Sequence, residues 1–454
     1  MTAEATNSPA AKPSSLYHLE AGSRRRKAAE KRFIGYGIAA IAAGLFFLFV
    51  LLFQIITNGA GAFTQTFIEV PVYLDAAKLD KNGGRNIEEM KKVTTFGYAP
   101  LIQNALAEQV ADLGLDTELA SGKDVKDMLS PSAPGQLRDY VLANPDSVGE
   151  TLTFSFLASS RVDGYLKGRV SRDSIAQDKS INVAQLDLTD QLREAGVLHK
   201  GFNTNFITGS DASDLRPEQA GFGQSILGSF AMMLVVLLVC LPISVAASIY
   251  LEEFAPKNKF TDFVEINISN LAAVPSIVFG ILALAAFIQF GGGTLNISAF
   301  RSSAPLVGGL ALSLMTLPTI IIATRASLKA VPGSIRDAAL GLGASRMQAV
   351  FHHILPLAMP GILTGTIIGL AAALGETAPL LMIGMVAFVQ SQGSIGGFFT
   401  DPNVGMPAEI YIWASRADGA WYERAWGGII ILLVFLLTMN LVAIILRRKF
   451  ERRW

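Results

Sequence analysis

Six stretches of the chain are apolar over the length that a helix needs to cross a lipid bilayer. A spanning helix takes about 20 apolar residues, because each residue adds about 1.5 Å and the hydrocarbon core is about 30 Å thick. Backbone polar groups inside a bilayer must be hydrogen-bonded internally, which leaves helices or closed barrels. We therefore expect an all-α transmembrane fold, with spans at Phe33–Ile56, Gly223–Tyr250, Phe263–Phe290, Ala304–Thr324, Leu357–Phe388 and Gly427–Leu446.

The composition agrees with an integral membrane protein. Of the 454 residues, 51% are hydrophobic and only 16% are charged, which is too apolar for an ordinary soluble protein of this length. The formal net charge of zero argues against nucleic acid as a partner, since nucleic-acid binders rely on a basic surface. The single cysteine, Cys240, lies in an apolar run. It excludes an intramolecular disulfide and a cysteine-based metal site, and we expect no metal.

Basic residues indicate on which side of the membrane the loops lie. They gather between Arg24 and Arg32, at the end of a polar, unpatterned tail (1–32) that precedes the first span (33–57). They gather again in the C-terminal tail (447–454) and in the loops after the second and fourth spans. Loops rich in lysine and arginine stay in the cytoplasm. We therefore expect both termini to be cytoplasmic and the first span to be a retained helix, because it begins too late for a cleaved signal peptide.

Residues 58–222, between the first two spans, have the length and composition of a small soluble domain on the periplasmic side. Alternating stretches such as Thr151–Phe156 and turn signals predict an α+β insert. No catalytic constellation stands out. His199 has no cysteine or serine partner at a suitable spacing, and Gly122–Lys123 lacks the upstream glycine of a phosphate-binding loop. We expect a structural or partner-docking domain, and no ATPase site in this chain.

A polar stretch, 331–356, interrupts the apolar runs while keeping helical spacing. Pro332 and Gly333 stop the preceding helix. Ser334 is placed to cap the next one, with Asp337 three residues later, where a carboxylate reaches the amide of the cap.

The same pattern then repeats. Gly343 is placed to end a short helix in a left-handed conformation, Ser345 can cap a second one with Gln348 three residues on, and Pro356 closes the stretch. The pattern predicts a cytoplasmic helix-turn-helix whose small residues favour close approach by another protein.

Asp337-Ala338-Ala339, Gly343 and Leu355-Pro356 resemble the signature loop of permeases from binding-protein-dependent ABC importers. Three further segments resemble the phosphate-specific permeases of the PstA type: Ile249–Ala255, Asn270–Gly280 and Gly375–Leu380. The similarity covers about residues 223–446.

This resemblance implies a six-helix type I importer permease with the soluble insert between its first two helices. Its core, 223–446, holds five of the transmembrane helices, and 331–356 are coupling helices that dock on an ATP-binding subunit. The coupling residues that it implies are Ser334, Arg336, Asp337, Ala338, Ala339, Gly343, Ser345, Arg346 and Pro356. Its implied partners are a PstC-type permease, a dimer of ATPase subunits that bind ATP and Mg, a periplasmic phosphate-binding protein, phosphate and membrane lipid. The implied location is a bacterial inner membrane, and the permease itself carries no cofactor.

Glu376 is the most informative residue within a predicted span, because ionisable side chains there are rare and face a cavity or a partner. As one straight helix, Leu357–Phe388 would reach about 48 Å, so we expect a break or a strong tilt, and Gly375 and Pro379 indicate a broken helix. Phosphate at neutral pH keeps an O–H group, from which a carboxylate can accept a hydrogen bond, whereas sulfate has no O–H. The candidate path residues are Glu376, Thr377, Asn267, Asn270, Ser276 and Arg325.

Several alternatives stay open at this point. Glu376 can pair instead with a basic group of a partner permease, the serine and asparagines can join helices, and Arg325 can be a membrane-side anchor. The substrate can be another oxyanion such as sulfate or molybdate. A secondary transporter driven by an ion gradient, and a membrane-anchored sensor with a ligand- or partner-binding domain, are the other two classes.

Overall fold

The computed structural model describes residues 21–80, 82–115, 119, 125–173, 181–386 and 397–450. The outer parts of the two predicted tails therefore lie outside the described residues. Contacts divide the chain into two units, Met1–Ile55 and Ile56–Trp454. Six of the described helices are long and apolar enough to cross a membrane: Gly22–Phe63, Gly223–Phe254, Ser276–Thr294, Pro305–Lys329, Arg346–Gly375 and Gly419–Lys449. The prediction of a helical membrane protein with six spans is confirmed.

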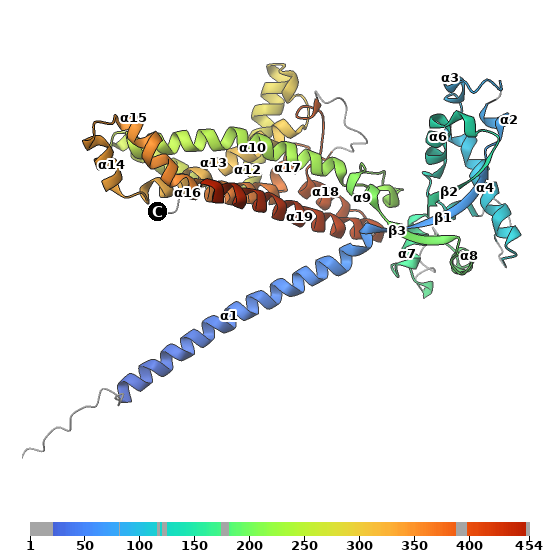
Figure 1. Ribbon diagram of the computed structural model, residues 1–454, viewed down its shortest axis with the longest axis horizontal. Coiled ribbons are helices and arrows are strands. Elements are labelled where there is room, and N and C mark those ends of the chain that lie inside the picture. Colours follow the sequence, from blue (N-terminus) through green and yellow to red (C-terminus); the bar gives the residue numbers. More distant parts are fainter. Residues whose placement is uncertain are drawn as a thin grey trace, which may run out of the picture. The chain divides into compact units, whose positions relative to one another are not determined.

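Helix α1 (Ala21–Gly59) provides the first span and makes up most of the first unit (Figure 1). It begins before the predicted start at Phe33, so residues 21–32 are helical and not an unpatterned tail. Alanine, arginine, lysine and glutamate predominate there and are strong helix formers. Extending an existing helix is far easier than starting one, which favours continuation of the apolar helix into this segment.

Three antiparallel strands form a sheet in the second unit, in the order β2-β1-β3. They are β1 (Thr64–Tyr73), β2 (Thr151–Leu157) and β3 (Leu198–Phe202). The strand predicted at 151–156 is therefore present. β3 covers only the first half of β1, up to Glu69, whose N–H donates to the carbonyl of Val197 at 3.1 Å. Beyond Glu69 no strand among the described residues pairs with this edge of β1, and Pro71 has no N–H to leave unpaired there.

Helices pack on this sheet and give it a hydrophobic core of its own. The longer ones are α4 (Thr95–Asp112), α6 (Ala133–Ala143) and α8 (Val183–Glu194), and the shorter ones are α2 (Ala76–Leu79), α3 (Ile87–Met90) and α7 (Ser160–Leu166). Alternate residues of β1 are buried in one hydrophobic core with Leu106 of α4, Leu137 of α6 and Leu186 of α8. The prediction of an α+β insert is confirmed.

The hydrophobic contacts place the end of the insert earlier than the predicted residue 222. Its core runs from Ile68 to Leu198. Phe206 and Phe222, in contrast, belong to the hydrophobic core of the membrane helices, together with Trp413 and Trp421. We therefore use "insert domain" for residues 64–202. Helix α9 (Thr204–Thr208) and the rest of 203–222 form part of the helical body, because their aromatic side chains are buried there.

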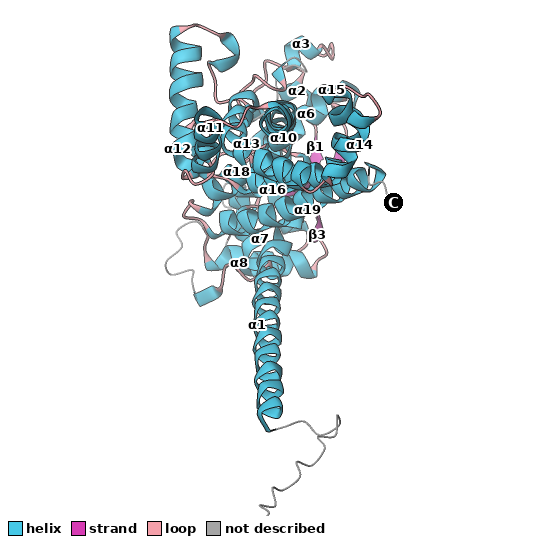
Figure 2. Cartoon of the chain, turned by 90° about the vertical axis from the view of Figure 1, so that its left-hand side faces the viewer, coloured by secondary structure: helices cyan, strands magenta, loops and turns pink. Residues whose placement is uncertain are grey.

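Four long helices form this helical body: α10 (Gly223–Ile249), α13 (Pro305–Lys329), α16 (Leu355–Gly375) and α19 (Gly419–Phe450). They lie side by side in both views (Figures 1 and 2). Small residues allow close approach: a Cβ atom added to Gly309 of α13 would lie 2.5 Å from the Cβ of Val235 in α10. The hydroxyl of Ser248 in α10 donates to the carbonyl of Ile321 in α13 at 3.1 Å. Both devices are typical of helix pairs in membranes, where the hydrophobic effect does not drive association.

The predicted third span, Phe263–Phe290, is wrong in its boundaries. The structure has a separate helix α11 (Lys259–Leu271), and then α12 (Ser276–Ala283), which continues as a π-helical segment, Leu284–Thr294. Pro275 precedes α12 and separates the two helices. A proline lacks the N–H of a helical ladder and disfavours helical geometry in the residue before it, which favours a break of the run at this position.

The structure confirms part of the predicted helix-turn-helix. Helix α14 (Gly333–Gly341) is followed by a turn in which Gly343 has φ +89°. The predicted reciprocal cap opens α15 (Arg346–Ala349): Gln348 N–H donates to Ser345 Oγ at 3.2 Å, and Ser345 N–H donates to Gln348 Oε1 at 2.8 Å.

Two details of the prediction for residues 331–356 are wrong. Pro332 and not Ser334 precedes the first helical residue, and no side chain caps α14. Pro356 does not close the stretch, because α15 continues through a π-helical turn, Val350–Ile354, into α16. A π-turn inserts an extra residue and absorbs the misfit around a helical proline.

The predicted break near Gly375 is confirmed. Helix α16 ends at that glycine, Glu376 has an extended backbone (φ −81°, ψ 119°), and α17 (Ala378–Met382) follows. Phe388, the predicted end of this run, lies outside the described residues. Helix α18 (Met406–Ala414) then leads to α19.

Candidate functional site

Opposite charges connect three elements at the α14 end of the helical body. The Arg325 Nε of α13 lies 3.2 Å from Glu252 Oε2, in the π-helical turn Tyr250–Phe254, and its terminal nitrogen lies 2.7 Å from Glu265 Oε1 of α11. Lys329 adds a contact with Glu252 at 3.5 Å. The guanidinium of Arg325 is thus occupied by two carboxylates, and this favours the anchor interpretation over the predicted path role.

A second pair joins α14 to the first helix of the body. Arg336 of α14 forms an ion pair with Glu253, whose side chain is only 2% exposed. A buried carboxylate needs its partner, because an unpaired charge away from water is strongly unfavourable. Arg336 therefore links α14 to the membrane helices and is only partly available to another protein.

The other predicted coupling residues differ in accessibility. Ser334, Asp337, Ala338, Gly343, Ser345 and Arg346 are exposed. Ala339 is buried, at 7% exposure, so the prediction that it offers a docking face is wrong: in the helix it points toward the protein. Leu342 was missed by sequence reasoning. It lies in the turn after α14 and is 90% exposed, and an exposed leucine in that turn can anchor a partner.

The break after α16 brings two distant segments together. Helix α17 packs on α12 so closely that a Cβ atom on Gly280 would lie 2.7 Å from Pro379 Cα. Glu376 and Thr377, just before α17, are half-buried, as is Ser276 at the start of α12. Within the part of the chain that the structure describes, the Glu376 carboxylate has neither an ion pair nor a hydrogen bond.

Asn267 and Asn270 lie apart from this contact, on α11, and both are exposed. The Asn267 side chain donates to the Phe263 carbonyl of its own helix at 2.7 Å. Large apolar side chains of α11 and α12 are also exposed around them, including Phe260 at 72% and Ile281 at 53%. These two helices therefore present a mixed apolar and amide surface to their surroundings.

Residues 243–454 match the family model described as "Binding-protein-dependent transport system inner membrane component". The chain is 32% identical over 234 residues to the phosphate transport system permease protein PstA of Xylella fastidiosa, an alignment that covers 51% of this chain and 77% of that protein. The chain belongs to this permease family. Residues 20–176 match a second model, "Domain of unknown function (DUF3333)".

Other relatives of the permease carry different names. It is 30% identical over 232 residues to the "Probable ABC transporter permease protein YqgI" of Bacillus subtilis, covering 49% of this chain and 76% of that protein. Among solved structures, a chain of the MetNI methionine ABC transporter matches with 17% identity and a TM-score of 0.39, covering 50% of the permease and 94% of that chain.

Membership in this family separates transport from ATP hydrolysis. Such permeases are not enzymes and work with separate ATPase subunits and a binding protein. Among the described residues, no group of three or more histidine, cysteine, aspartate or glutamate side chains could hold a metal ion.

We predict that Arg336→Met destabilises the permease by about 1–3 kcal/mol, because the buried Glu253 loses its charged donor. Adding Glu253→Leu should restore most of that loss, since a buried ion pair can be replaced by apolar groups. The thermal unfolding midpoint of the purified complex measures both. Arg346→Met, which removes an exposed arginine of the same region, is the matched control. An equal loss in the single and double variants would contradict a pairing role.

Proposed function

We propose that this chain is a permease subunit of an ATP-driven phosphate importer. The observation that carries the proposal is the similarity over three-quarters of the length of proteins named phosphate transport system permease protein PstA, such as that of Xylella fastidiosa. A protein with the same printed name from Haemophilus influenzae is 29% identical over 224 residues. The segments that suggested this type from the sequence include α12 and the start of α17, which pack on each other.

The proposed topology places the α14 end in the cytoplasm of a bacterial inner membrane, with both termini on that side. The basic clusters of the chain support it, including Arg447, Arg448 and Lys449 in the last turn of α19. The insert domain then lies in the periplasm. In this arrangement a periplasmic phosphate-binding protein delivers its ligand at the insert-domain end, and an ATPase dimer binds at the α14 end.

The proposed path runs between this chain and a second, PstC-type permease. The exposed surface of α11 and α12 supports this, because its large apolar side chains and its amides are left uncovered by the rest of the described chain. Glu376, Thr377 and Ser276 belong to elements that pack together beside that surface. Irregular backbone at membrane depth must be buried in protein or line a cavity, and residues 375–377 fulfil this beside a path.

Glu376 has a chemical reason to favour phosphate. A carboxylate repels an anion, but it accepts a hydrogen bond from the O–H that phosphate keeps at neutral pH. Sulfate has no such proton, and a site that leaves its acceptor unpaired rejects the wrong ligand by a large factor. The other donors to phosphate would come from Thr377, Ser276 and the partner permease.

The experiment that tests the function is uptake and ATP hydrolysis by the complete complex in proteoliposomes, with its binding protein. We expect phosphate to stimulate ATP hydrolysis, and a tenfold excess of sulfate to leave phosphate uptake unchanged. Strong inhibition by sulfate or molybdate would assign the importer to another oxyanion. Uptake that persists with an ATPase-inactive partner would indicate a gradient-driven transporter instead.

We predict that Glu376→Gln lowers the preference for phosphate over sulfate about tenfold or more, because an amide can donate to sulfate as well as accept from phosphate. Competition uptake in proteoliposomes measures the ratio. Glu108→Gln, the same change at an exposed position of the insert domain, is the control. An unchanged preference in Glu376→Gln would remove the selectivity role from this residue.

The exposed side of α14 and the turn after it form the proposed contact with the ATPase. We predict that Leu342→Asp weakens co-purification of the ATPase about tenfold, because it puts a charge where an apolar anchor would enter a groove. Leu215→Asp is the matched control, since Leu215 is 86% exposed outside this region and Leu342 is 90% exposed. Normal co-purification of Leu342→Asp would contradict docking through this turn.

A further inference from the structure

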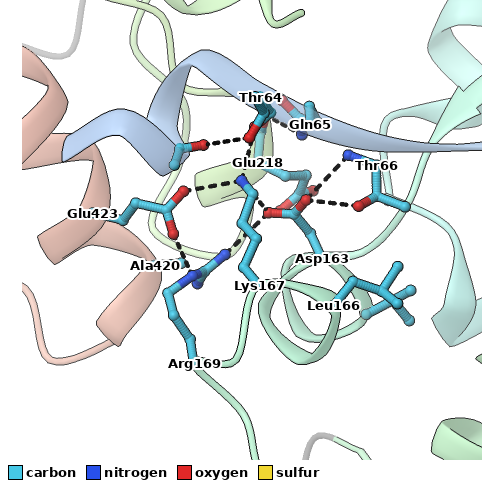
Figure 3. A network of polar contacts seen from close by, with 12 residues as sticks. Thr64, Gln65, Thr66, Asp163, Leu166, Lys167, Arg169, Glu218, Ala420 and Glu423 are labelled. Carbon is cyan, nitrogen blue, oxygen red and sulfur yellow. Dashed lines mark hydrogen bonds and ion pairs between the residues drawn. The ribbon is translucent and has the colours of Figure 1, made fainter. Parts of the chain in front are cut away.

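A buried cluster of charged residues connects the insert domain to the start of α19 (Figure 3). The Lys167 ammonium of the insert domain lies 2.9 Å from Glu423 Oε1 of α19 and 2.7 Å from Asp163 Oδ2. Arg169 also pairs with Glu423, and its terminal nitrogen lies 3.0 Å from Asp163 Oδ2. The side chains of Lys167 and Glu423 are each only 8% exposed, and that of Asp163 is 3% exposed.

Strand β1 contributes backbone and side-chain partners to the same cluster. Both the N–H and the hydroxyl of Thr66 donate to Asp163 Oδ1, at 3.0 and 2.9 Å, and Lys167 donates to the carbonyl of Thr64 at 2.7 Å. Asp163 therefore accepts hydrogen bonds or ion pairs from four groups. A carboxylate this well satisfied holds its neighbours in one geometry.

A second group of contacts lies beside the first. Arg424, the neighbour of Glu423, donates to Gln65 Oε1 of β1 at 3.2 Å and to the carbonyl of Glu218 at 3.1 Å. The Glu218 carboxyl accepts from Ser130 Oγ of the insert domain at 2.5 Å. Burial raises the pKa of Glu218, and the bond from Ser130 opposes that shift.

The charges of these two groups balance. Lys167, Arg169 and Arg424 supply three positive charges, and Asp163, Glu218 and Glu423 supply three negative ones. An uncompensated charge in a buried interface costs several kcal/mol, so sliding or separation of the two surfaces would expose unpaired groups on both sides. Domains joined only by linkers have solvated contacts that allow relative motion. The interface between the insert domain and α19 is instead buried and paired in charge, which opposes relative motion.

Helix α19 connects this cluster to the rest of the helical body. It packs on α16, which is continuous with α15 and follows the turn after α14. Helices in contact with one another thus lead from the α14 end to the insert domain within the described residues. Arg161 and Asp418, 3.3 Å apart, add a contact between the insert domain and the residue before α19.

We propose that the insert domain is a fixed part of the transport machinery and moves as one body with the outer end of α19. It thereby carries to the periplasmic surface the rearrangement that ATP produces at α14. This assigns a role to a domain that its family model leaves without one. The inference rests on the proposed ATP-driven function, but it is independent of which oxyanion is transported.

Hydrogen exchange of the complete complex in nanodiscs, with and without ATP and vanadate, tests the proposal. In the wild type we expect the segments 160–170 and 419–426 to change their exchange rates together, each about tenfold. In Lys167→Met with Glu423→Leu, which removes one charge of each sign, the change in 160–170 should be lost. The strands of the insert domain should keep their protection, showing that the variant is folded.

The control variant is Arg172→Met with Asp187→Leu, which removes a pair 2.7 Å apart that is about half exposed on the same domain. It should retain the joint change. A wild-type change confined to α19, or a joint change that survives in the Lys167 and Glu423 variant, would overturn the proposal. If the exchange rates of both segments change together in a complex whose ATP hydrolysis phosphate does not stimulate, the proposal on the insert domain stands. Only the proposed substrate is then refuted.

Discussion

The need to satisfy every backbone polar group inside a bilayer governs this permease. Long helices satisfy these groups within the chain, and the breaks before Pro275 and at Glu376 lie beside other protein segments. The break before Pro275 and the break at Glu376 are far apart in sequence, yet the helices that follow them, α12 and α17, pack on each other. The two irregular segments thus lie next to the contact between α12 and α17. A transport path is compatible with the membrane at this place.

Charge is concentrated at the two ends of the helical body. At one end, Arg325 and Arg336 pair with glutamates of neighbouring elements and hold α11 and α14 to the long helices. At the other, the cluster around Asp163 and Glu423 holds the insert domain. Between the ends, glycines and hydroxyls allow helices to approach closely. Such a body is suited to transmitting displacement, because neither α14 nor the insert domain can separate from the long helices without breaking ion pairs.

Most of the local structure could be predicted from the sequence. Gly343, Ser345 and Gln348 act through bonds between near neighbours, so their pattern alone predicted the turn and the cap. The length of 357–388, together with Gly375 and Pro379, predicted the break. Predictions failed where contacts with residues distant in the sequence determine the burial of a side chain. A small residue such as Ala339 suits both a docking surface and a buried position, and only the packing of α14 shows that it is buried. The apolar run around Pro275 predicted one span, and this concealed the two separate helices α11 and α12.

The sequence by itself determined the membrane fold, the six spans and the α+β insert, because apolar length and periodicity are properties of continuous segments. It also carried the family resemblance that the comparisons confirm. Only the tertiary structure decided which charges pair. Lys167 and Glu423 are separated by more than half of the chain, and nothing local to either one indicates the other. The same holds for the end of the insert domain near residue 202, since the burial of Phe206 against Trp413 depends on helices that come much later in the chain.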